Sequence, residues 1–113
     1  MTDRLAPVSN SETWEDTLEF FDSEDGEAWF TEAVPPDEIT LRLRDRDTGE
    51  IVLSGALTTG ELTVVADGFV DFVFSAARMS DLCPKQYEVG VLYTAQSATK
   101  QAILGVISIL RGL

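Results

Sequence analysis

Residues 39–44, Ile-Thr-Leu-Arg-Leu-Arg, alternate apolar and polar side chains without interruption, and this alternation is the clearest indication of the fold. Successive side chains of an extended strand point to opposite faces, so the three aliphatic residues share one face. Asp47-Thr48-Gly49-Glu50 has the composition of a turn, and the β-rich run 51–54 follows it. The sequence therefore predicts two antiparallel strands with one buried face each.

Similar short runs recur on both sides of this pair, and each ends at a turn signal. Asp67-Gly68 lies between two runs rich in β-branched and aromatic residues, which is a strong hairpin signal. The other predicted strands cover residues 14–20, 62–66, 69–74 and 87–93, with a short returning strand at 28–30. Strands spaced by turns in this way are typical of a sandwich or a small barrel.

The last apolar run, Ala102–Leu110, fits either a buried strand or a buried helix by apolarity alone. Its three isoleucines, its valine and its mid-run glycine favour a strand. Residues 75–82 are the one helical candidate elsewhere, and they suffice for only a turn or two. We therefore predict an all-β chain, with a flexible N-terminal lead-in over residues 1–12 and a single domain over residues 13–113.

The formal net charge of the chain is −12, and it is unevenly distributed. Residues 12–38 contain eleven acidic residues and no lysine or arginine. Such a surface repels phosphate groups, so we predict no binding to nucleic acid and none to an anionic membrane. A basic protein partner, a bound cation and simple solubility all fit this charge, and solubility is the most economical interpretation.

No catalytic residue is indicated by the sequence. The chain has no histidine and a single cysteine, Cys83, which excludes an internal disulfide and a nucleophile–histidine pair. Between Leu82 and Pro84, Cys83 is predicted to pack in the interior. The dispersed glycines form no phosphate-binding or dinucleotide-binding motif. We therefore predict that the protein is not an enzyme and has no cofactor.

Two acidic turns, residues 22–27 and 45–50, carry several carboxylates each and raise the question of calcium. Neither has the ligand spacing of the twelve-residue EF-hand loop. We interpret both as solvated turns and predict no metal site.

Two tryptophans, Trp14 and Trp29, also admit two interpretations. With the neighbouring phenylalanines they would form an exposed platform for a sugar ring, or they belong to the core. The alternation of Trp14, Leu18 and Phe20 favours the core.

Neither an export signal nor a membrane helix is indicated. The first thirteen residues lack the basic end and the apolar stretch of a secretory signal, and no apolar run reaches the roughly 20 residues of a membrane helix. The sequence predicts synthesis in the cytoplasm without secretion, which suits an unpaired thiol.

The stretch 82–91, Leu-Cys-Pro-Lys-Gln-Tyr-Glu-Val-Gly-Val, resembles the corner of fibronectin type III and related immunoglobulin-like sandwiches. In that family a leucine and a proline precede a tyrosine that opens an alternating strand. The resemblance implies a structural corner at Pro84 and Tyr87, with the tyrosine ring in the core and its hydroxyl bonded back to the backbone. It also implies an immunoglobulin-like antiparallel β-sandwich of about seven or eight strands.

From Trp14 onward, the order of strands and turns resembles the small immunoglobulin-like modules of phage tail and baseplate proteins, including the N-terminal domain of baseplate upper proteins. That resemblance implies a non-enzymatic component of a phage or prophage virion, incorporated at the tail, the baseplate or the head–tail junction through contacts with other protein subunits. The alternative is a ligand-binding module, either for carbohydrate through Trp14 and Trp29 or for a basic protein through residues 12–38.

The two faces of Ala102–Leu110 predict a homo-oligomer. Both faces are largely apolar, whereas a strand of a two-layer sandwich needs only one apolar face. We expect Ile103, Ile107 and Ile109 to face outward as an interface, with Leu92 of the neighbouring strand extending it. The alternative is that the N-terminal segment covers this face, so that Ile107→Lys disturbs folding and not assembly.

Overall fold

The computed structural model describes residues 3–4, 7–21, 24–95 and 98–111. The elements among them are β1 (Asp3–Arg4), β2 (Val8–Ser9), β3 (Trp14–Glu19), β4 (Glu38–Asp45), β5 (Ile51–Ala56), β6 (Leu62–Ala66), β7 (Phe69–Phe74), α1 (Ala76–Met79), β8 (Gln86–Ala95) and β9 (Ala98–Leu110). The all-β class predicted from the sequence is confirmed.

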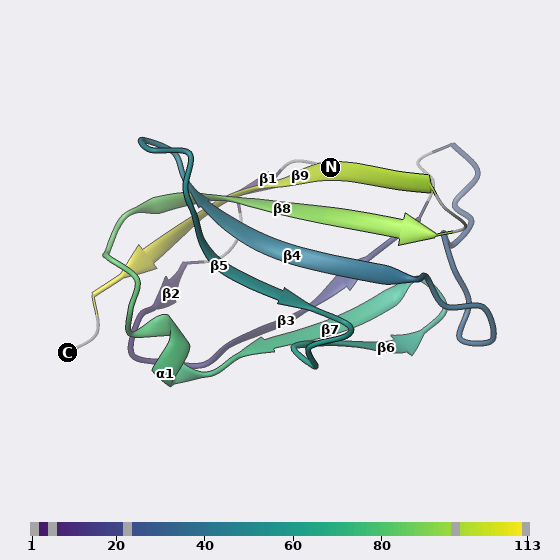
Figure 1. Ribbon diagram of the computed structural model, residues 1–113, viewed down its shortest axis with the longest axis horizontal. Helices are drawn as coiled ribbons and strands as arrows, with labels where there is room; N and C mark the ends of the chain where they lie inside the picture. Colours follow the sequence, from purple (N-terminus) through teal and green to yellow (C-terminus); the bar gives the residue numbers. More distant parts are fainter. Residues whose placement is uncertain (1–2, 5–6, 22–23, 96–97, 112–113) are drawn as a thin grey trace.

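The strands form two sheets that face one another (Figure 1). The larger sheet has the order β1-β9-β8-β4-β5, and β2 pairs with β9 as well. The smaller sheet has the order β3-β7-β6. Neighbouring strands run antiparallel except that β1 and β2 are parallel to β9.

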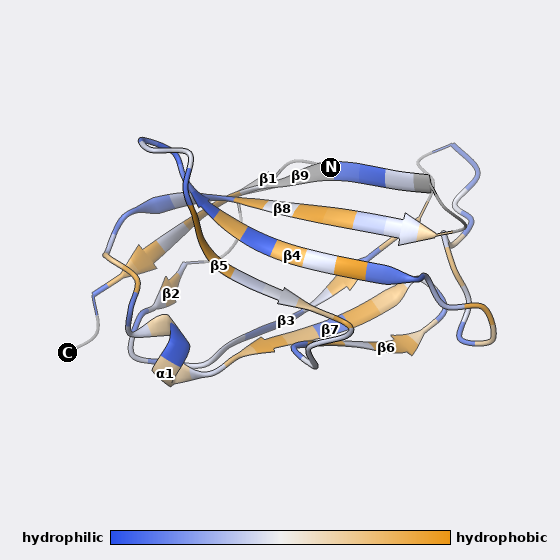
Figure 2. Ribbon diagram, in the orientation of Figure 1, coloured by the Kyte–Doolittle hydropathy of each residue, from blue (hydrophilic) through white to orange (hydrophobic). Residues whose placement is uncertain are grey.

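Apolar side chains from the facing sides of the two sheets form the core. The alternation that predicted β4 is visible as bands of hydropathy along that strand (Figure 2), and Ile39, Leu41 and Leu43 are all fully buried. Val70 and Phe74 of β7 meet them from the smaller sheet and are buried as well. Each large apolar side chain moved out of water in this way contributes roughly 1.5–3 kcal/mol before entropic costs.

Two glycines are required by the backbone around the smaller sheet, one in a turn and one at a close contact between the sheets. Gly68 closes the predicted β6–β7 hairpin with a φ of 77°, a left-handed conformation that residues with a Cβ rarely adopt. Gly55 of β5 has no room for a side chain, because a Cβ there would lie 2.7 Å from the Cβ of Glu61 and 2.8 Å from the ring of Phe74. The absent side chain lets the edge of the larger sheet approach the smaller one closely.

The last apolar run is a strand, as predicted, and β9 begins earlier than expected, at Ala98. Its faces are the reverse of our expectation, because Ile107 and Ile109 are 0% and 2% exposed and lie in the core. The outward face carries the half-buried Ser108 and the exposed Leu110. The polar Ser108 lies on the solvent side, and the two isoleucines fill the space between the sheets.

Part of the predicted N-terminal lead-in pairs with β9. Asp3 lies opposite Gly105 and Val8 opposite Ile109. Val8 is buried, and the amide of Asn10 donates to the carbonyl of Leu110 at 2.9 Å. These contacts occupy the outer edge of β9, where the sequence alone suggested a flexible segment.

Two smaller expectations had different outcomes. The predicted strand at 28–30 does not form, since Ala28 makes only an isolated bridge with Phe21. The helical candidate at 75–82 is the single turn α1, capped by the hydroxyl of Ser75, which accepts from the amide of Arg78.

Candidate functional site

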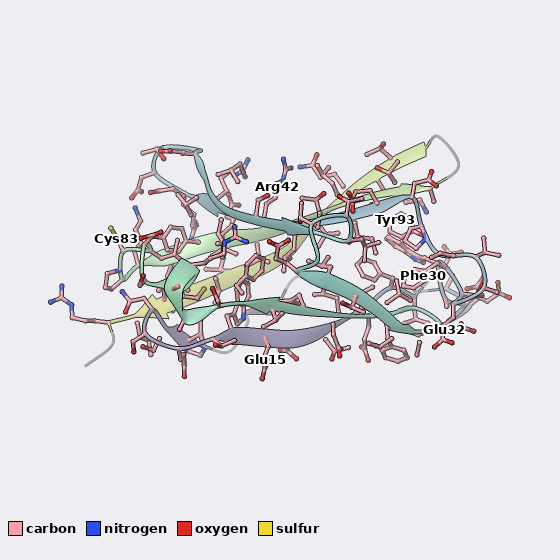
Figure 3. The ribbon with its side chains drawn as sticks, turned by 60° about the horizontal axis from the view of Figure 1, so that its bottom comes forward. Glu15, Phe30, Glu32, Arg42, Cys83 and Tyr93 are labelled. Atoms are coloured by element: carbon pink, nitrogen blue, oxygen red, sulfur yellow. The ribbon has the colours of Figure 1, made fainter. Side chains whose placement is uncertain are left out.

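The outward face of the smaller sheet is acidic. The odd-numbered residues of β3, Glu15, Thr17 and Glu19, are exposed on it, and Asp71 of β7 lies opposite Thr17. Strands β3, β6 and β7 contain no lysine or arginine. Figure 3 shows Glu15 on this face and Arg42, from the larger sheet, on the opposite face of the molecule. The outer face of the larger sheet is mixed in charge, because Arg42 and Arg44 lie there beside Glu88, whereas the outer face of the smaller sheet is acidic.

A shallow groove of about 470 Å³ lies on this acidic face. The hydroxyl of Thr17 donates a 2.6 Å hydrogen bond to Oδ1 of Asp71 within it, and Val73, 43% exposed, adds an apolar patch. Carboxylates and hydroxyls arranged in this way suit a cationic group. The residues lining the groove are Glu15, Asp16, Thr17, Glu61, Thr63, Asp71, Phe72 and Val73.

Most of the acids in this groove have no basic neighbour. The ion pairs found in the described part of the chain join Arg44 to Glu88, Arg78 to Glu61, and Lys85 to Asp45 and Asp47. Of the acids that line the groove, these pairs include only Glu61. Glu15, Asp16 and Asp71 therefore take part in no ion pair among the described residues.

A second groove, of about 240 Å³, follows the outer edge of β3. The core residues Trp14 and Phe72 and the half-buried Leu18 contribute to its lining, and Pro7 and Val8 contribute from the N-terminal segment. It lies on the side where β3 and β2 border the space between the two sheets. This side of the sandwich is therefore incompletely covered.

The other side of the sandwich, between β5 and β6, is closed by side chains. Arg78 donates to Oε2 of Glu61 at 2.9 Å and to the carbonyl of Ser54 at 2.8 Å, and its guanidinium lies 5.3 Å from the ring centre of Phe74. One arginine thus ties α1 to both sheets.

Glu38 reinforces the same side. Its carboxylate accepts hydrogen bonds from the amides of Ile39, Leu57 and Thr58 and from the hydroxyl of Thr58. Burial raises the pKa of Glu38, and the bonds from Thr58, Ile39 and Leu57 lower it by more, so its pKa lies below the ordinary 4.5. The two sides of the sandwich therefore differ, with one held by polar contacts and the other bordered by a groove.

The tryptophans do not form an open platform. Trp14 is 6% exposed and stacks on Phe74 with ring centres 5.6 Å apart, so the interpretation of Trp14 as a core residue is the correct one. Trp29 is half-buried, with Tyr93 edge-on at 5.2 Å and the ammonium of Lys100 4.7 Å from its ring centre. A sugar ring would have to displace Lys100 to stack there.

At the predicted corner, the ring of Tyr87 is 2% exposed and its hydroxyl donates to the carbonyl of Cys83 at 2.9 Å. Burial raises the pKa of the Tyr87 hydroxyl, with the nearby Cys83 adding to the effect. Pro84 is exposed in the turn before β8.

The side chain of Cys83 is exposed, so the prediction that it packs in the interior is wrong. The residue buried at this point is its neighbour Leu82. The turn thus leaves the side chain of Cys83 in solvent and that of Leu82 in the core.

The carboxylates of Asp45 and Asp47, in the acidic turn 45–50, form ion pairs with Lys85 of the same chain. Nζ of Lys85 lies 2.9 Å from Oδ2 of Asp45 and 3.2 Å from Oδ2 of Asp47. The hydrogen bonds that Lys85 donates, first to Asp45 and second to Asp47, raise the pKa of Lys85 to about 12. No cluster of metal-binding side chains is found among the described residues, which leave out part of the other acidic turn, at 22–23.

The four predicted interface residues are not brought together on one surface. Ile107 and Ile109 are core residues, and Leu92 is half-buried on the outward face of β8. The side chain of Ile103 lies outside the part of the chain that the structure describes. A hydrophobic interface centred on Ile107 is therefore excluded, because its side chain is inaccessible.

The acidity of residues 12–38 is evident from the sequence, whereas the residues that join them on this face are not. Asp71 comes from β7 and Glu61 from the turn before β6, and their position beside β3 depends on the order β3-β7-β6. The outward position of Asp71 was readable from the alternation Val70-Asp71-Phe72. The pairing of β7 with β3 was not, because no local pattern specifies a partner strand.

Comparisons with known proteins bear on the fold alone. No protein-family model and no curated protein sequence matches the chain. A solved structure described as the X-ray structure of the endo-beta-1,4-mannanase from Thermotoga petrophila is similar, with a TM-score of 0.56 and 13% sequence identity. The likeness covers 94% of this chain and 18% of that one, so this chain corresponds to a small part of the mannanase. At this identity the two share a fold.

Helices long and apolar enough to cross a membrane are not found in the part of the chain that the structure describes.

Proposed function

We propose that this protein is a non-enzymatic assembly module that binds a basic protein subunit through the outer face of its smaller sheet. The observation that carries the proposal is the segregation of charge. Glu15, Glu19 and Asp71 share a face whose strands contain no lysine or arginine. A field of one sign over a grooved surface attracts and orients a partner of the opposite sign.

A basic partner fits better than either a carbohydrate or a second copy of the chain. The sugar-binding alternative relied on Trp14, which is buried, and on Trp29, which Lys100 covers. A second copy would place its own carboxylates against Glu15 and Glu19, and like charges across an interface are unfavourable. The chain also lacks histidine, the usual general base, which supports binding over catalysis.

The proposed fold type is an immunoglobulin-like sandwich, and the proposed setting is a phage or prophage virion. The corner supports the fold type, because the hydroxyl of Tyr87 reaches back four residues to the carbonyl of Cys83 as the tyrosine of such corners does. The setting rests on the resemblance in strand and turn order. There the module would join tail, baseplate or head–tail components through protein contacts.

Binding of oligolysine, measured by calorimetry at low and at physiological salt, tests the proposed face. We expect binding that weakens with salt and is lost in the variant Glu15→Gln, Glu19→Gln, Asp71→Asn. The matched control Glu24→Gln, Glu27→Gln, Glu50→Gln removes the same charge from exposed turns and should bind nearly as the parent does. Equal losses in the two variants would mean that net charge alone attracts the probe, and the proposed face would be wrong.

A further inference from the structure

The outer edge of β3 has backbone groups that pair with no strand of the described residues. Within that part of the chain, β3 pairs with β7 alone. The amide of Phe20, directly after β3, donates to the carbonyl of Gly68 at 2.7 Å, so the even-numbered residues here face β7. The backbone groups of Glu15, Thr17 and Glu19 therefore point to the open edge. An exposed edge of this kind is a template for an additional strand.

One side chain protects this edge at present. Oδ1 of Asp16 accepts from the amide of Thr17 at 2.8 Å. A carboxylate on an edge strand also opposes pairing with an identical acidic strand, since like charges directly opposite one another are destabilising. Pairing of this edge with β3 of a second copy is therefore disfavoured by charge repulsion, whereas pairing with a positively charged strand is not.

The groove beside the edge supplies contacts for the side chains of such a strand. A strand added to β3 would direct alternate side chains to the two faces of the smaller sheet. Those on the inner side would enter the groove of about 240 Å³, where Trp14, Leu18 and Val8 offer apolar contacts and Glu12 and Asp16 contribute carboxylates. Those on the outer side would lie beside Glu15 and Glu19. Apolar residues suit the first environment and basic residues the second.

We propose that the free edge of β3 takes up an extended segment of the basic partner as an added strand, with apolar and basic residues alternating along it. This proposal rests on the proposed function and specifies how the acidic face is used. In this mode of recognition, backbone hydrogen bonds provide the affinity and alternate side chains the specificity. The contrast with the β5–β6 side, closed by Arg78 and Glu38, explains why the partner enters at β3.

A peptide of alternating lysine and valine tests the added strand. A length of about eight residues covers the six residues of β3 and extends slightly beyond its ends. The control is the same peptide with every internal backbone amide methylated, which keeps the charges and side chains but cannot pair with β3. We expect the unmethylated peptide to bind at least about tenfold more tightly, since several hydrogen bonds are at stake. It should also slow hydrogen exchange at the amides of Glu15 and Glu19. Equal affinity of the two peptides would overturn the added strand and leave the acidic face as the binding site, whereas failure of oligolysine to bind would remove the proposed function itself.

Variants of Thr17 provide an independent measurement. Thr17→Pro removes the edge amide and leaves the pairing with β7 intact, because proline is tolerated on an edge strand when its nitrogen faces solvent. It should weaken the peptide about tenfold or more. Thr17→Val keeps the amide but loses the hydroxyl that bonds to Asp71 in the acidic groove, so it measures the contribution of that hydroxyl, and it should weaken the peptide less than Thr17→Pro does. Parental affinity in a folded Thr17→Pro variant would contradict the proposal.

Light scattering of the protein without peptide tests whether a second copy of the chain pairs with the edge of β3. We expect Thr17→Pro to leave the oligomeric state of the protein unchanged. A dimer that Thr17→Pro converts to a monomer would assign the edge of β3 to a second copy of the chain and overturn the proposal. If Thr17→Pro fails to fold, the comparison of the two peptides on the unaltered protein still decides the matter.

Discussion

The hydroxyl of Tyr87 donates to the carbonyl of Cys83, four residues earlier, and so ties the start of β8 to the turn that precedes it. The ring is buried in the core, which leaves that carbonyl as the acceptor within reach of the hydroxyl. Because a buried donor must find a partner inside the fold, the bond fixes the direction in which β8 leaves the turn.

Tyr87→Phe is expected to reduce the free energy of unfolding by roughly 1 kcal/mol, the usual net value of one buried hydrogen bond. Urea denaturation followed by fluorescence measures the change. Tyr93→Phe is the matched control, because its hydroxyl makes a longer bond, 3.3 Å to the carbonyl of Trp29, and should cost less. Identical midpoints for Tyr87→Phe and the parent would show that the corner bond contributes no stability.

Ile107→Lys should prevent folding and should not act by separating subunits. The side chain is 0% exposed between the two sheets, and a buried charge without a partner costs about 4 kcal/mol or more. Leu110→Lys, on the exposed face of the same strand, should change stability by less than about 0.5 kcal/mol. Thermal melts combined with light scattering distinguish the two effects. A folded monomeric Ile107→Lys variant of an oligomeric parent would restore the outward interface that the burial of Ile107 excludes.

Glu38→Gln should make the stability less dependent on pH. The folded protein favours the ionised form of Glu38, because its pKa lies below 4.5, so its contribution is present above that pH. The contribution is lost as the pH falls through the lower pKa of the folded state. We expect the variant to be less stable by about 1 kcal/mol at pH 7 and to converge with the parent in acid.

The measurement is urea denaturation between pH 7 and pH 3. Glu24→Gln, on an exposed turn, is the control and should leave the stability at pH 7 unchanged. A constant difference between Glu38→Gln and the parent at every pH would mean that the charge of Glu38 is irrelevant to the fold.

Gly55→Ala should destabilise the protein by about 1–3 kcal/mol, the usual cost of overpacking. The added methyl group would lie 2.7 Å from the Cβ of Glu61, a contact that requires the backbone to move. Ser54→Ala, one residue earlier and exposed, keeps the carbonyl that Arg78 uses and should cost little. A melting temperature of Gly55→Ala equal to that of the parent would show that β5 moves away from β6 without cost.

Strands with one polar face were predicted well from the sequence, and a strand with two apolar faces was not. In β4 the arginines mark the solvent side, so the inward position of Leu41 and Leu43 follows from alternation alone. In β9 both faces are apolar, and the only polar marker near Ile107 is Ser108. Choosing the buried face there requires knowledge of the opposing sheet.

Long-range pairing accounts for most of what the sequence did not reveal. Val8 belongs to a short N-terminal stretch without the alternation of a strand, and only the register of β2 with Ile109 explains its burial. The grooves at β3 likewise combine residues from separate strands, so local composition identified the acidity of the segment and not the surface it forms.

The pairing of β1 and β2 with β9 also orders events during synthesis. Val8 leaves the ribosome long before its partner Ile109, which lies 101 positions later in the sequence. The edge of β9 therefore receives its covering strands only after β9 itself has been translated, and contacts between such distant residues form slowly. Until then Val8 has no place in the core, so a nascent chain stalled before β9 leaves this apolar residue open to chaperones.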